Sequence, residues 1–141
     1  PFKAAYDGVR FLLTVSTIDK ANLSLYYADQ RLLAAKILFE KDKPDIGFST
    51  LTKAEKYLEQ ASTLEKEERK KGGDTSFFLT TLAQASLKHR AILEEISQFA
   101  PDDAKAQINK VQDYSKTVFR EISETLISKG MRLPENPFSG G

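Results

Sequence analysis

The sequence predicts an all-α protein, an antiparallel helical bundle of four long helices preceded by a short N-terminal helix. Apolar residues recur at alternating spacings of three and four, the pattern of helices that pack along a seam. Proline and glycine separate these segments, and the connections are short, so neighbouring helices are expected to run antiparallel. No 34-residue repeat of the tetratricopeptide type accompanies the pattern.

The N-terminal helix is expected over residues 2–15. Its apolar residues fall near one face: Phe2, Tyr6, Val9 and Leu13. Ser16 or Thr17 suits the N-cap of the first long helix, and Asp19 is favourable in its first turn. That helix is expected to run to about residue 42. Its seam is Ile18, Ala21, Leu25, Ala28, Leu32, Ala35 and Phe39, in which alanine recurs every seventh residue and predicts a closely approaching neighbour.

The second long helix is expected to start near Pro44, which suits a first helical turn, and to end before Gly72–Gly73. Its seam is Leu51, Ala54, Leu58, Ala61 and Leu64. Asp74 or Thr75 suits the cap of the third long helix, which is expected over residues 75–99. The seam of that helix is Phe78, Leu82, Ala85, His89, Ile92, Ile96 and Phe99.

The fourth long helix is expected to begin near Pro101 and to end at Gly130. Its seam is Ala104, Ile108, Val111, Ser115, Val118, Ile122 and Leu126. Residues 1–132 are therefore expected to form one helical bundle domain. Residues 133–141 contain two prolines and no periodicity, which indicates a flexible C-terminal tail or linker.

Composition excludes several kinds of chemistry. The 21 basic and 20 acidic residues leave a net charge of +1, which gives no electrostatic case for nucleic acid as a partner. The absence of cysteine excludes disulfides, thiolate zinc sites and cysteine nucleophiles. No apolar run reaches the roughly 18 residues that span a bilayer. Contact with a membrane is therefore expected only through an anchor outside this segment.

His89 is the single histidine, and it occupies a seam position between Ala85 and Ile92. We expect it to be packed and hydrogen-bonded across the seam. A histidine phosphotransfer domain would need an exposed histidine followed by a Lys-Gly pair, and Ile92 and Leu93 stand at those places. An alternative is a small-molecule or metal sensor in which His89 acts with Glu94 or Asp113. A single histidine disfavours zinc, and we predict no catalytic, cofactor-binding or metal-binding residues.

Two pairs of adjacent aromatic residues, Tyr26–Tyr27 and Phe77–Phe78, place one member of each pair away from the core. Tyr26, Phe77 and Phe119 are therefore candidates for a partner surface, together with His89 as a sensing residue. The alternative is a wide core face that two neighbouring helices share.

Four stretches together resemble a bacterial, extracytoplasmic, all-helical domain family of unknown function. They are "PFKAAYDGVRFLLT" at 1–14, "DKANLSLYYADQRLLAA" at 19–35, "LKHRAILEEI" at 87–96 and "PDDAKAQI" at 101–108. The resemblance implies a domain held outside the cytoplasm, usually behind one membrane anchor, and it transfers no catalytic residues. Residues 47–65 depart from the family pattern in being richer in serine and threonine.

These observations predict a non-enzymatic extracytoplasmic module for protein interaction or envelope sensing, with an unknown protein partner and no cofactor. The alternatives are the sensor centred on His89 and a cytoplasmic helical scaffold or regulatory domain. The seams are compatible with a monomer or a dimer.

Overall fold

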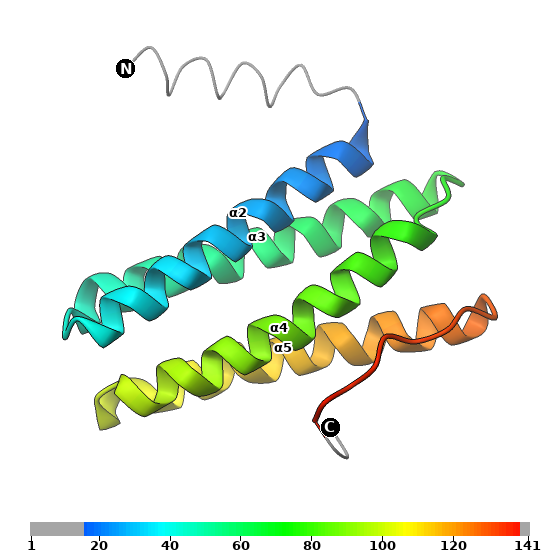
Figure 1. Cartoon of the computed structure of the whole chain (residues 1–141). Coiled ribbons are helices and arrows are strands. Elements are labelled where there is room, and N and C mark those ends of the chain that lie inside the picture. Colours follow the sequence, from blue (N-terminus) through cyan, green and yellow to red (C-terminus); the bar gives the residue numbers. More distant parts are fainter. Residues whose placement is uncertain (1–15, 139–141) are drawn as a thin grey trace, which may run out of the picture.

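Two antiparallel helical hairpins pack against each other in the computed structural model, which describes residues 16–138 (Figure 1). The first hairpin consists of α2 (Thr17–Glu40) and α3 (Pro44–Lys70), and the second of α4 (Ser76–Phe99) and α5 (Asp102–Ser128). The prediction of an all-α bundle with four long helices is confirmed. The short helix expected over residues 2–15 lies outside the described residues.

The helix ends follow local sequence signals. The Ser16 hydroxyl caps α2 by accepting a hydrogen bond from the backbone N–H of Asp19 at 3.4 Å. Pro44 is the first residue of α3, where its missing N–H costs nothing. After α3, Gly72 adopts a φ of 90°, a left-handed conformation that suits glycine, and the chain turns toward α4.

Small residues bring α2 and α3 together along their whole length, and this pair has the most extensive contact between helices. Alanines at 21, 28 and 35 are fully buried on α2, and the same seven-residue spacing on α3 is occupied by Gly47, Ala54 and Ala61. Small residues thus recur at the same spacing on both helices of the hairpin, which lets the two backbones approach closely. A Cβ atom at Gly47 would lie only 3.0 Å from the Phe39 ring. A side chain at this position would therefore require the Phe39 ring to shift.

The two hairpins meet mainly through α2 and α4, which run in the same direction (Figure 1). The Lys36 ammonium lies 2.6 Å from the Glu95 carboxylate across this contact. Its hydrogen bond to Glu95 raises the pKa of Lys36. Contact between α3 and α5 is slighter and includes an ion pair of 3.5 Å between Lys66 and Glu121.

The buried apolar residues form two clusters, one toward each end of the bundle. One cluster holds Leu25, Leu58, Leu82 and Ile122 among others, and the second holds Leu32, Leu51, Ile96 and Ile108. The intervening positions of α4 and α5 are His89 and Ser115, both buried. A polar layer thus divides the core near its middle.

Most predicted seam residues are buried. The prediction is wrong for Phe99, which is half exposed because it is the last residue of α4, and Ala100 takes the next place in the core. Ile18, Leu64 and Ala104 are only partly buried.

The segment after α5 contains no helix up to residue 138 and runs back along the bundle. Met131 and Leu133 pack against the first core cluster. The Arg90 guanidinium lies 4.0 Å from the centre of the Phe138 ring. The described part of the predicted tail, residues 133–138, therefore makes specific contacts with the bundle.

Candidate functional site

The most distinctive polar contact in the core joins α4 to α2. His89 Nε2 lies 2.6 Å from Asp29 Oδ1, although the histidine is only 3% exposed. The seam pattern of α4 turns His89 inward, and the Asp29 side chain, 30% exposed, reaches it from the edge of α2. A hydrogen bond to a carboxylate is stronger than one between neutral groups, and it fixes the ring orientation.

The carboxylate beside His89 is Asp29, and the sequence-based pairing with Glu94 or Asp113 is wrong. Glu94 and Asp113 are both exposed to solvent. Asp113 lies near Lys116, at 4.0 Å. Both carboxylates therefore belong to the solvated faces of their helices.

His89 also lines a cavity of about 10 Å³ at the centre of the bundle. The cavity receives residues from all four described helices, and its polar lining consists of Glu55, His89, Tyr114 and Ser115. Burial, followed by the negative charges of nearby glutamates, raises the pKa of Tyr114 to about 12. A cavity of this size has room for about one water molecule, and an organic ligand does not fit in this conformation.

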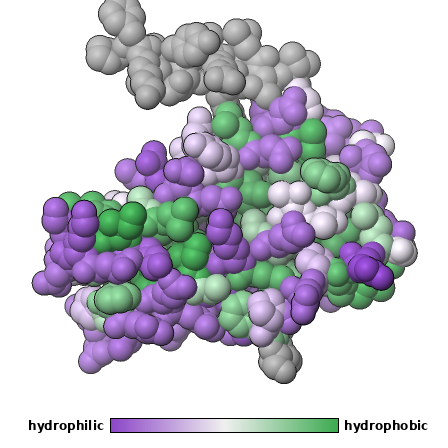
Figure 2. Space-filling model, viewed as in Figure 1, coloured by the Kyte–Doolittle hydropathy of each residue, from purple (hydrophilic) through white to green (hydrophobic). Residues whose placement is uncertain are grey.

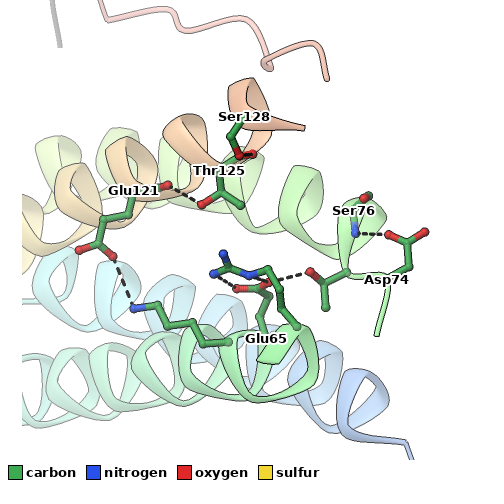
Figure 3. A network of polar contacts seen from close by, with 9 residues as sticks. Glu65, Asp74, Ser76, Glu121, Thr125 and Ser128 are labelled. Atoms are coloured by element: carbon green, nitrogen blue, oxygen red, sulfur yellow. Dashed lines mark hydrogen bonds and ion pairs between the residues drawn. The ribbon is translucent and has the colours of Figure 1, made fainter. Parts of the chain in front are cut away.

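A second buried polar cluster lies where α3 turns into α4 (Figure 3). The Glu65 carboxylate is 2% exposed and accepts hydrogen bonds from Arg69 Nε at 2.9 Å and Thr75 Oγ1 at 2.7 Å. Next to it, the hydroxyl of Ser76 and then its backbone N–H, which lies 3.0 Å from Asp74 Oδ1, lower the pKa of Asp74 by hydrogen bonding to the carboxylate. Through Glu65 and Thr75 the cluster ties the end of α3 to the start of α4.

The predicted aromatic candidates differ in their exposure to solvent. Tyr26 is exposed on α2, where it contacts Tyr27 with 5.9 Å between ring centres. Phe77 is exposed in the first turn of α4. Phe119 is partly buried and packs against the first core cluster.

A groove missed by the sequence reading lies at the end of the bundle where α2 turns into α3 and α4 turns into α5. We call this the turn end. The groove has a volume of about 330 Å³ and is lined by Pro44, Asp45, Phe48, Pro101, Asp103 and Ala104. Large apolar side chains exposed near the same two turns are Ile37, Ile46 and Phe99. Figure 2 shows hydrophobic surface, bordered by hydrophilic surface, toward this end of the molecule.

Within residues 16–138, no three histidine or carboxylate side chains are grouped to hold a metal ion. None of the helices described is long and apolar enough to cross a membrane. The described residues form a buried polar layer in the core and, at one end, a groove lined by apolar side chains and two carboxylates.

Fold and sites together define an all-helical domain built on a polar layer and tight alanine packing. A family model described as Domain of unknown function (DUF5667) matches residues 1–103, which is more than half of the chain. The protein therefore belongs to this family, and the expected membership of a domain family of unknown function is confirmed. The match takes in α2, α3 and α4 and ends at the start of α5. No curated protein and no solved structure matches the chain.

Proposed function

We propose that this domain is a non-enzymatic protein-interaction module, held outside the cytoplasm by a membrane anchor, that binds a protein partner at the turn end. The observation that carries the proposal is the groove there, with Ile37, Ile46 and Phe99 exposed at the same end. Scattered exposed apolar residues are ordinary, but a group of them beside a concave surface is typical of a binding site.

The lining of the groove suggests the chemistry of the partner. Phe48, Pro44 and Pro101 offer rigid apolar surface, which is favourable at the centre of an interface. Asp45 and Asp103 add two carboxylates to the same groove. A protein segment with an apolar side chain next to lysine or arginine would complement both features.

The extracytoplasmic part of the proposal is supported by the sequence resemblance over residues 1–14 and 19–35. The interaction part is supported by the surface of the turn end. The two parts are independent, and each needs its own experiment.

The interaction is tested by site-specific photo-crosslinking in the native host, with the full-length parent protein. A photo-reactive phenylalanine analogue replaces Ile46, which is 58% exposed at the turn end. The matched control carries the analogue at Ile127, which is 61% exposed at the opposite end of the bundle, in the last turns of α5.

We expect a discrete crosslinked protein from position 46 and none from position 127. The crosslink should disappear when Phe48→Asp is added, and melting of the purified variant shows whether its fold is retained. Equal crosslinking from both positions, or none from position 46, would contradict the proposed surface.

External protease applied to spheroplasts tests the compartment, because an extracytoplasmic domain is cut while a cytoplasmic control protein survives.

A further inference from the structure

We infer that the polar layer binds one buried water molecule, which bridges Ser115 Oγ and the second ring nitrogen of His89. The inference rests on the cavity, on an unsatisfied hydroxyl and on the hydrogen bonding of the histidine. It does not depend on the proposed interaction function.

The cavity matches one water in size and in lining. Its volume is about 10 Å³, close to the space that a single water needs. Empty cavities of this kind in proteins are apolar throughout, whereas this one is lined by an imidazole, two hydroxyl groups and a carboxylate. The residues around the cavity therefore include groups that can hydrogen-bond to a water.

Ser115 supplies the second observation. Its side chain is 1% exposed, and its Oγ atom has no hydrogen-bond partner among the described residues. Buried hydroxyl groups are almost always hydrogen-bonded, directly or through water. Since Ser115 lines the cavity, a water there satisfies it without any movement of the helices.

His89 explains why a water suits the site better than a further side chain. With Nε2 bonded to Asp29, the imidazole has one remaining nitrogen, Nδ1, which accepts a hydrogen bond in the neutral ring and donates one in the charged ring. Water both donates and accepts, so it serves either state. The result is a continuous chain of hydrogen bonds, Asp29 to His89 to water to Ser115, which crosses from α2 through α4 to α5.

A cation is a poorer occupant. The rest of the lining is apolar: Leu32, Leu51, Ala54, Leu58, Leu93 and Val111. Within the described part of the chain, no cluster of three ligating side chains surrounds the site. A bare ion would lose its hydration shell there without adequate replacement.

Oxygen-17 relaxation dispersion of the solvent tests the inference, because it counts long-lived internal waters in solution. The test variant is Ser115→Val, which fills the cavity with methyl groups. The matched control is Ser24→Val, because Ser24 Oγ is also buried and without a partner among the described residues but does not line this cavity.

We expect Ser115→Val to lose one long-lived water relative to the wild-type chain. Unchanged counts in a folded Ser115→Val protein would overturn the inference, as would an equal loss in Ser24→Val. If Ser115→Val does not fold, a crystal structure of the wild-type chain decides. A water peak bonded to Ser115 Oγ and His89 Nδ1 supports the inference, and a dry cavity overturns it.

Discussion

His89 and Asp29 connect the two hairpins through a short contact, 2.6 Å between Nε2 and Oδ1, in the polar layer of the core. The histidine is buried and the aspartate is partly exposed, so the two residues depend on the contact to different extents. Without His89, Asp29 can turn to solvent. Without Asp29, the ring nitrogen stays buried and loses its partner.

This asymmetry predicts the effect of Asp29→Ala. The substitution should lower the free energy of unfolding by about 1–3 kcal/mol, because it leaves a buried polar group unsatisfied. Chemical denaturation of the purified domain measures the change. In a His89→Leu background, the same Asp29→Ala substitution should leave the free energy of unfolding nearly unchanged, since no buried imidazole then needs a partner.

Additive effects of Asp29→Ala and His89→Leu would show that the two residues do not interact in solution. Lys36→Ala provides the comparison, because the Lys36–Glu95 pair is partly exposed at the same α2–α4 contact. We expect that substitution to lower the free energy of unfolding less than Asp29→Ala does, because solvent screens an exposed ion pair.

How much of this could be predicted from the sequence depends on whether a feature lies within one helix or between helices. The spacing of apolar residues places His89 and Ser115 on inward faces without further information. It does not give the register between helices. Asp29 is 60 residues away in the chain from His89, so no local pattern links the two.

Glu65 shows the same limit. Glu65 lies one turn after Ala61 and continues the seam of α3. From the sequence alone, however, a glutamate at this position predicts the start of a solvent-exposed helix end. Only the folded chain brings Thr75 to its carboxylate. The groove at the turn end was missed for a related reason, because Pro44 and Pro101 belong to separate turns that meet only after the hairpins pack.

The close approach of α2 and α3 predicts that Ala28 cannot be enlarged. Ala28→Leu should reduce the free energy of unfolding by about 1–3 kcal/mol, because added methyl groups in a packed seam force side chains and helices apart. Ala106→Leu is the matched control, since Ala106 is exposed on α5. A stable Ala28→Leu protein with an unchanged melting temperature would show that the hairpin is looser than described.

The Glu65 cluster predicts that Arg69→Ala lowers the free energy of unfolding more than Glu65→Gln does. Arg69→Ala leaves a buried carboxylate with Thr75 as its hydrogen-bond partner, and we expect a loss of about 2–3 kcal/mol. Glu65→Gln removes the buried charge, and Arg69 is partly exposed and can reach solvent, so about 1 kcal/mol is expected. Thermal and chemical denaturation give the order, and the reverse order would refute this account. Lys66→Ala, which breaks an exposed pair, should change stability by less than about 1 kcal/mol.

Tyr114 predicts a loss of stability at high pH. Its pKa is raised from 10.0 to about 12 in the folded protein, mainly by burial. Below the unfolded pKa both states keep the proton, and the contribution to stability is fully present. As pH rises toward the folded pKa, the unfolded state releases its proton first, so the free energy of unfolding falls.

Between roughly pH 9 and pH 11, the ionisation of Tyr114 should lower the free energy of unfolding by about 1 kcal/mol. This is less than the pKa shift alone would give, because the side chain is only half-buried. Tyr114→Phe cannot ionise, so subtracting its denaturation curves from those of the wild-type chain cancels the titration of lysines and of the other tyrosines. The difference in free energy of unfolding should decline across this interval. A flat difference would show that the Tyr114 hydroxyl ionises as readily in the folded bundle as in the unfolded chain, and the polar layer would then be more open to solvent than the structure shows.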